Sequence, residues 1–200
     1  MVRIGRQIPH FKEVDLSSIT ASFSEDRRYR YLLQMQYGRS LYDSARSRKA
    51  SVILKNPSAA DTRLADSTIR KVETFIYHHL GDVAQLSILN IFALRATDAK
   101  DVNREYESLG ETAVVGPEND KTIRKIAGEA DYVVVAWGNR SGISSELYEK
   151  RIRAVKQMIT EVKPVRIFEV KGAKETIQPL HGMMWGYNHK LVPFLKMKEN

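Results

Sequence analysis

The chain of 200 residues is long enough for one domain with a sizeable core, and its lack of cysteine excludes disulfides and cysteine-rich zinc sites. No apolar run reaches the roughly 18 residues of a membrane-spanning helix. The first residues lack the apolar core of a secretion signal, so we expect a cytoplasmic protein without a membrane partner. The formal net charge of +8 favours a phosphate-bearing partner, because lysines and arginines that neutralise phosphates release bound counterions.

Residues 1–49 are predicted to form a β-rich appendage. Two short, β-prone segments, residues 19–24 and 29–38, are separated by the charged sequence EDRR. A polar loop that carries Arg46, Arg48 and Lys49 is expected to follow them. We therefore expect N-terminal antiparallel strands that extend the sheet formed by the rest of the chain.

Strands are predicted to alternate with helices from residue 50 onward. Four apolar runs have the length of buried strands: residues 50–54, 86–92, 132–137 and 165–170. This alternation predicts an α/β fold of three layers, α/β/α, around a mostly parallel, four-stranded central sheet. Residues 50–200 would form this core within a single domain.

Helical patterns lie between the predicted strands. One helix would bury a stripe formed by Ile69, Val72, Ile76 and Leu80, and a later one would bury a stripe between residues 148 and 162. Proline followed by acidic residues at positions 117–120 indicates the start of another helix. Ligands of such folds bind beyond the carboxyl ends of the strands, so the segments after the four runs should share one edge.

The sequence NPSAAD follows the first of these strands. Pro57 forces an extended or turn conformation, and Ser58 or Asp61 could cap the next helix. In a purely structural interpretation these polar residues only satisfy backbone groups. In a functional one Asn56 and Asp61 are catalytic, while Pro57 and Ser58 contact the substrate near helix amides that suit an anion.

The segment FALRATD, residues 92–98, follows the second strand and opens a long connection. Arg95 could bind a phosphate or carboxylate, and Thr97 and Asp98 could bind a sugar or orient the arginine. The alternative is a surface turn with a local Arg–Asp pair. The predicted position of residues 92–98 at the ligand-binding edge of the sheet favours the functional interpretation.

Three further segments carry candidate residues. Asn119 lies at a helix start, where acidic neighbours also have a structural role through the helix dipole. Trp137 could stack on a base and Gly138 would allow close backbone approach, although a tryptophan is equally common in a core. His181 could stabilise negative charge or transfer a proton, or could be structural.

Common catalytic and cofactor signatures are missing. The chain has no phosphate-binding GxxxxGK[ST] loop, no GxGxxG after a strand, no HExxH and no GxSxG. The adjacent His78 and His79 point to different faces of a helix and make a poor metal pair. We predict no metal and no cofactor.

Five motifs in order resemble the domain-of-unknown-function family 1643 (DUF1643), a set of bacterial and phage proteins. They are NPSAAD, DSTIR, NIFALRATD, VGPEND and AWG, and the resemblance covers roughly residues 28–185. The chain differs from the family pattern at Ala59, Ala65 and Ser67, and after His181 it reads Gly-Met-Met where the family resembles Pro-Leu-Tyr.

The motif order is also similar, more distantly, to that of the uracil-DNA glycosylase superfamily. This resemblance implies that NPSAAD faces the scissile glycosidic bond, that His181 stabilises the departing base, that Asn90 lies near the base and that Arg95 contacts phosphate. A fold-level analogy does not establish a reaction.

Three functions stay open from the sequence. The first is base recognition in nucleic acid with glycosylase-like cleavage of an N-glycosidic bond. The second is a non-catalytic nucleic-acid-binding module, and the third is a small-molecule enzyme that processes nucleotides. We expect nucleic acid or a nucleotide as the partner, and whether the protein is an enzyme stays open.

Overall fold

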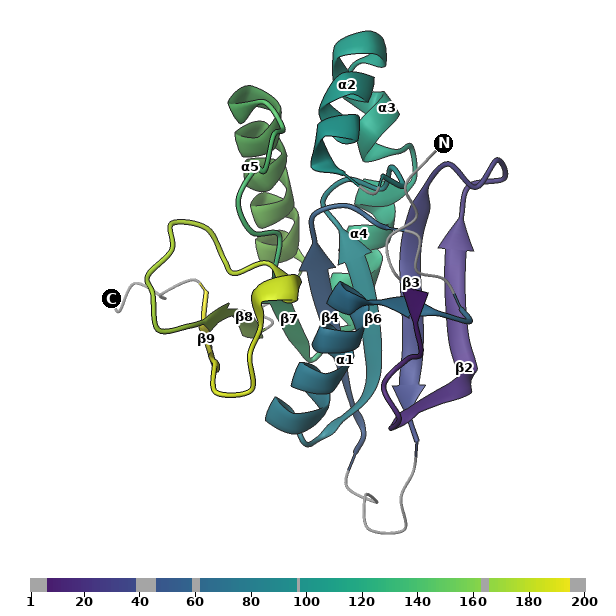
Figure 1. Cartoon of the computed structure of the whole chain (residues 1–200), viewed down its shortest axis with the longest axis vertical. Coiled ribbons are helices and arrows are strands. Elements are labelled where there is room, and N and C mark those ends of the chain that lie inside the picture. Colours follow the sequence, from purple (N-terminus) through teal and green to yellow (C-terminus); the bar gives the residue numbers. More distant parts are fainter. Residues whose placement is uncertain (1–6, 39–45, 59–61, 97, 163–165, 195–200) are drawn as a thin grey trace.

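The computed structural model describes residues 7–38, 46–58, 62–96, 98–162 and 166–194. The fold is α/β, with helices packed on a large mixed sheet (Figure 1). None of the helices in these ranges is both long and apolar enough to cross a membrane.

Within the described ranges the main sheet has seven strands in the order β2-β3-β6-β4-β7-β8-β9. In chain order they are β2 (Val14–Phe23), β3 (Arg30–Tyr37), β4 (Arg48–Leu54), β6 (Val83–Asn90), β7 (Tyr132–Val135), β8 (Arg166–Lys171) and β9 (Lys190–Pro193). A separate antiparallel pair joins β1 (Gln7–Ile8) to β5 (Ala65–Asp66).

The described sheet is mixed and has three strands more than the predicted four-stranded, mostly parallel centre, so that specific arrangement is not confirmed. The four predicted runs do form β4, β6, β7 and β8, which pair in parallel. The β2–β3 hairpin adds antiparallel strands at one side, as expected, and β9 adds an unexpected one at the other. The short β9 contains lysine and proline, which are typical of an edge strand and hide it from pattern analysis.

The loop predicted around Arg46, Arg48 and Lys49 is also shorter than expected, because β4 begins at Arg48. The Arg48 guanidinium donates to the Asp131 carboxylate at 2.7 Å, and the Lys49 amide donates to the same carboxylate at 2.9 Å. These contacts extend the strand into a polar sequence. The division into an appendage and a core stays a prediction.

The described residues form five α-helices and one short 3-10 helix between the strands: α1 (Ser67–His79), α2 (Ala99–Leu109), α3 (Thr112–Val115), α4 (Asn119–Glu129), α5 (Ser145–Glu161) and η1 (Gly182–Met184). The connection predicted after residue 98 as a long loop therefore contains α2 and α3. The helix predicted near Pro117 begins two residues later, at Asn119, after a turn in which the Asn119 amide donates to Gly116.

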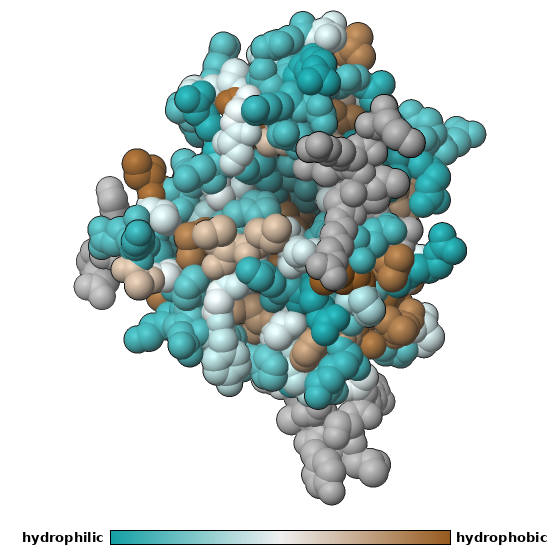
Figure 2. Space-filling model, viewed as in Figure 1, coloured by the Kyte–Doolittle hydropathy of each residue, from teal (hydrophilic) through white to brown (hydrophobic). Residues whose placement is uncertain are grey.

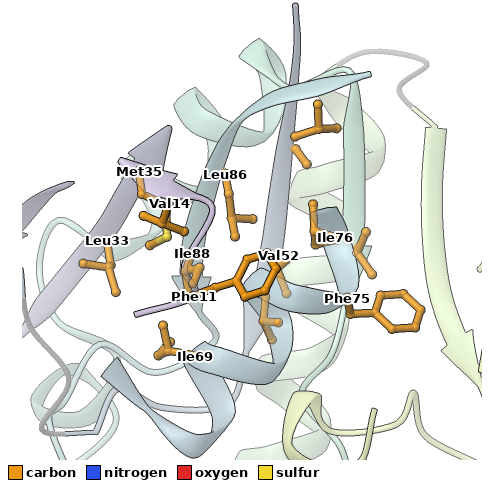
Figure 3. Packing of buried hydrophobic residues seen from close by; sticks show 14 of the residues in the cluster. Phe11, Val14, Leu33, Met35, Val52, Ile69, Phe75, Ile76, Leu86 and Ile88 are labelled. Atoms are coloured by element: carbon orange, nitrogen blue, oxygen red, sulfur yellow. The ribbon is translucent and has the colours of Figure 1, made fainter. Parts of the chain in front are cut away.

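Two hydrophobic clusters cover opposite faces of the sheet. Val52 and Leu54 of β4 point into one cluster, whereas Ile53 points into the other, as the alternation of a strand requires. The helix α1 packs on the first face, and α4 and α5 pack on the second. Figure 2 shows that the surface seen in this view is mostly hydrophilic, and Figure 3 shows the packing of α1 side chains on the first face.

Candidate functional site

Two neighbouring cavities lie beyond the carboxyl end of β4. The inner cavity has a volume of about 190 Å³, and its polar lining residues are Arg30, Lys55, Asn56, Ser58, Asp66, Thr68 and His181. The outer cavity has a volume of about 480 Å³, and its polar lining residues are Lys55, Asn139, Ser141, Thr176, Gln178 and His181. Lys55 and His181 line both cavities, which together we call the cleft. Figure 2 shows the surface hollowed in this region, between α2 and η1.

Lys55 follows Leu54 directly at the end of the central strand β4. It is only 6% exposed, and its Nζ donates to the Ser141 Oγ at 3.0 Å. Burial lowers the pKa of the Lys55 ammonium to about 8. Within the described part of the chain Lys55 forms no ion pair with a carboxylate.

His181 faces Lys55 from the segment before η1. Its Nδ1 accepts a hydrogen bond from the Met183 amide at 3.2 Å, which places the ring proton on Nε2 in the neutral form. Burial, and secondly the positive charge of Lys55, lower the pKa of His181 to about 4, while Asp66 acts in the opposite direction. At neutral pH the imidazole is therefore an uncharged hydrogen-bond donor.

Gly138 allows His181 to occupy this position. Its φ is 69°, and a Cβ added there would lie 2.6 Å from the His181 Cβ. The Tyr148 hydroxyl donates to the Gly138 carbonyl, and burial raises the pKa of Tyr148, which keeps this hydroxyl protonated. Gly138 therefore lines the outer cavity mainly as the backbone on which the histidine packs.

The predicted NPSAAD turn forms part of the inner cavity. The Asn56 Nδ2 donates to the Ala96 carbonyl at 2.6 Å, and the Ala96 amide donates to the Pro57 carbonyl at 3.0 Å. These bonds fix the turn to the segment that follows β6. They leave the Asn56 Oδ1 without a hydrogen bond from any described residue. Asp61 lies outside the described residues.

Asp66 is the only carboxylate among the described residues that line the two cavities. Its side chain caps α1 by accepting from the amides of Thr68 at 2.7 Å and Ile69 at 2.8 Å. It also accepts from the Ser58 hydroxyl. Because three donors already occupy it, this carboxylate is poorly placed to take a proton from water. It caps the helix in place of the predicted Ser58 or Asp61.

Two buried asparagines lie deeper in the fold. Asn119 donates from Nδ2 to the carbonyls of Asn90 at 3.1 Å and Ile91 at 3.3 Å, and it has no exposed surface. The side-chain nitrogen and oxygen of Asn90 are buried and have no hydrogen-bond partner among the described residues. Asn90 pairs in register with Leu54 of β4. Leu54 lines the inner cavity, whereas Asn90 does not.

Two other predicted residues, Arg95 and Asp98, are not among those that line the cleft. Arg95 donates to the Arg27 carbonyl at 3.2 Å and lies 5.2 Å from the Phe23 ring centroid. Asp98 caps α2 through the Lys100 amide at 2.9 Å. Thr97 lies outside the described residues.

Trp137 has no exposed surface and belongs to the second hydrophobic cluster. Its Nε1 donates to the Gln178 Oε1 at 3.2 Å, and its ring packs edge-on against Phe194. A base could not stack on this ring without a rearrangement of the core. The bond to Gln178 nevertheless links the ring to a residue that lines the outer cavity.

The sequence interpretation overlooked Lys55, Asp66 and Arg30. A lysine that continues the apolar run SVIL directly into a turn was a usable signal, because lysines are rarely buried without a reason. Arg30, only 1% exposed, carries no comparable signal within its tyrosine-rich segment. Within the described part of the chain, no group of three or more His, Cys, Asp or Glu side chains could hold a metal ion.

Comparison with known proteins places the chain in a family. No curated protein and no solved structure matches it, so the likeness to the uracil-DNA glycosylase fold has no support from a structural neighbour. One family model matches residues 30–181, and its description is "Protein of unknown function (DUF1643)". The matched region begins at Arg30 and ends at His181, and so includes every residue that lines the inner cavity. The chain therefore belongs to the DUF1643 family.

Proposed function

We propose that the cleft binds a nucleotide, or a nucleobase within nucleic acid, and stabilises negative charge on it. The observation that carries this proposal is the pair of Lys55 and His181 in a cleft whose single described carboxylate, Asp66, is occupied by three donors. A buried cation that forms no ion pair with a described carboxylate attracts an anion strongly, because water screens the interaction poorly there.

The two side chains offer complementary interactions. Below pH 8 Lys55 supplies a full positive charge, and the neutral His181 supplies an Nε2–H donor. The outer cavity, at about 480 Å³, falls in the size range of small-molecule sites, while the inner one accommodates a smaller group such as a phosphate. The net charge of +8 suits the same class of ligand.

A second candidate function is hydrolysis of an N-glycosidic bond. In this reaction water adds to the sugar carbon as the C–N bond breaks, and the base leaves with the electron pair and then takes a proton. An uncharged imidazole donor beside a cation would stabilise the departing base. His181 favours this candidate, whereas the occupied state of Asp66 favours binding without catalysis. The net positive charge fits a small-molecule enzyme that processes nucleotides as well as it fits a protein that binds nucleic acid.

The decisive experiment measures binding and turnover on the same preparations. Nucleosides and nucleoside monophosphates would be titrated by calorimetry into the wild type, Lys55→Met and Lys121→Met. Lys121 is the matched control because its side chain is 84% exposed on α4. We expect the monophosphates to bind more tightly than the nucleosides, and Lys55→Met alone to weaken them at least about tenfold.

Turnover would be tested by mass spectrometry on DNA that contains uracil, deaminated, alkylated and hypermodified bases. A free base released by the wild type but not by Asn56→Ala or His181→Ala would establish the glycosylase-like activity. Absence of nucleotide binding at low salt, or equal binding by Lys55→Met, would overturn the proposed function.

A further inference from the structure

A groove lined by aromatic and basic side chains lies on the outer side of α1. Residues of α1 form one wall and residues 185–187 form the other, around a volume of about 150 Å³. Its aromatic lining residues are Phe75, Trp185 and Tyr187, and its basic ones include Arg70, Lys71 and His78. No carboxylate is found among the described residues that line it. We call it the aromatic groove.

The floor of the aromatic groove is rigidly packed. The rings of Phe75 and His79 stack with centroids 3.8 Å apart at 8°, and Phe75 also contacts Trp185 at 4.8 Å. The His79 Nε2 lies 3.1 Å from the Tyr187 carbonyl oxygen and ties the second wall to α1. The groove is therefore built into the fold and does not depend on a ligand to form.

The rim of the aromatic groove is open to solvent. Tyr187 is 75% exposed, and its ring centroid lies 5.9 Å from that of His78. An exposed tyrosine whose backbone is held in place offers a flat face for another ring at little entropic cost. Such a face is suited to a nucleobase, since every base has a π-surface.

The cations at the aromatic groove keep their charge available. Arg70 donates to the carbonyls of Pro9 at 2.7 Å and His10 at 2.9 Å, and Lys71 donates to the Met183 carbonyl at 2.6 Å. These partners are neutral, and neither cation pairs with a carboxylate among the described residues. Their charge therefore favours an anionic ligand, which a phosphate backbone supplies.

The aromatic groove lies next to the outer cavity. Met183 and Met184 of η1 line that cavity, while the bond from Lys71 joins the Met183 backbone to the groove. Figure 1 shows η1 beside α1 at the edge of the sheet where the cleft lies. The two methionines are 43% and 62% exposed and form an apolar surface between the two sites. A chain of nucleotides could extend from the cleft across η1 into the groove.

We infer that the ligand is a single-stranded nucleic acid, with one nucleotide in the cleft and a neighbouring base stacked on Tyr187 in the aromatic groove. This inference rests on the proposed function for the cleft and names its substrate class. The combination of stacking rings with unneutralised cations is typical of sites that bind single strands without strong sequence preference. Bases paired in a duplex could not reach this groove, because their faces are covered by stacking.

The test compares strands with mononucleotides. Fluorescence anisotropy would measure binding of labelled single-stranded DNA, single-stranded RNA and duplex DNA to the wild type, Tyr187→Ala, Tyr187→Phe and Leu109→Ala. Leu109 is the matched control, since it is 59% exposed on α2. We expect Tyr187→Ala to weaken strand binding about 5- to 100-fold, and Tyr187→Phe and Leu109→Ala to retain it. Mononucleotide binding should not change in any of these variants.

The two proposals fail in different ways. If Lys55→Met weakens mononucleotides but Tyr187→Ala leaves strand binding unchanged, the groove inference is wrong and the proposed function stands. If strand binding depends on Tyr187 while mononucleotides do not bind, the groove is supported and the cleft proposal is wrong. Binding of duplex as tight as that of single strands would overturn the single-strand assignment. The DNA and RNA probes separate the two kinds of strand.

Discussion

Replacing Lys55 by methionine should make the protein more stable while it weakens anion binding. Methionine has a similar length and volume, so it can fill the same space without the buried charge. Lys55 is 6% exposed and has the Ser141 hydroxyl as its hydrogen-bond partner, and no carboxylate of the described residues forms an ion pair with it. The wild-type lysine therefore destabilises the free protein, as is common for groups held in place for function.

The expected gain follows from the pKa. Burial lowers the pKa of Lys55 from 10.5 to about 8, and each pKa unit corresponds to about 1.4 kcal/mol. The unfavourable free energy of the charged form is thus about 3 kcal/mol as an upper bound. Water in the open cleft screens part of it, so we expect Lys55→Met to raise the free energy of unfolding by about 1–2 kcal/mol. For a chain of this size that corresponds to about 2–8 °C in Tm.

The pH dependence has a defined sign. Below pH 8 the lysine is charged in both the folded and the unfolded state, so its full destabilising effect is present. Between pH 8 and 10.5 the folded state loses its proton first, so the wild type gains stability as the pH rises. The advantage of Lys55→Met should therefore be largest at pH 6–7 and should shrink across this window.

Urea unfolding followed by circular dichroism at pH 6, 7, 9 and 10.5 would measure the difference, with Lys121→Met as the exposed control. The free energy of unfolding of Lys121→Met should lie within about 0.5 kcal/mol of that of the wild type at every pH. A variant Lys55→Met that is less stable than the wild type at pH 7, or whose difference from the wild type does not change with pH, would refute the reasoning.

Two further substitutions test the packing around the cleft and at the N-terminal segment. Gly138→Ala should destabilise the fold by about 1–3 kcal/mol and weaken nucleotide binding, because its φ is positive and the new Cβ would collide with His181. The control is Gly81→Ala, whose new Cβ would have no atom within 4 Å and should change neither property. Urea unfolding and calorimetry would measure the two effects. Glu73→Ala should lower the free energy of unfolding by about 3 kcal/mol in thermal melts, because it removes a buried carboxylate that lies 2.5 Å from the His10 Nδ1 and accepts from the Phe11 amide at 2.8 Å. A loss below about 1 kcal/mol would contradict this.

The sequence predicted the central strands and the apolar faces of the helices well. Continuous apolar runs such as residues 50–54 can only be buried on both faces, and the stripe through Ile69, Val72 and Ile76 can only face a core. It did not predict β9, or that the connection after Asp98 is helical. The polar sequence of α2 carries a weak apolar stripe, so its helical state depends on caps and neighbours.

The candidate site was predicted in part. The NPSAAD turn and His181 do come together, as the rule for the edges of parallel sheets suggested, and Gly138 contacts the histidine. Arg95 instead contacts the Arg27 carbonyl, Asp98 caps α2, and Trp137 and Asn119 are buried in the core. Residue type alone does not distinguish these outcomes, because an arginine, a tryptophan or an asparagine serves equally well in a core, a cap or a site.

The sequence by itself determined that a parallel α/β unit would present polar turns at one edge, since hydrophobic periodicity specifies which segments must be buried together. Only the tertiary structure decided which charges meet there. Lys55 and His181 lie far apart in the chain. Both line the cleft because Gly138, which has no side chain, lets His181 pack closely on its backbone. Burial lowers the pKa of Lys55, and burial together with the charge of Lys55 lowers the pKa of His181. Both causes are properties of the assembled cleft and not of any local sequence.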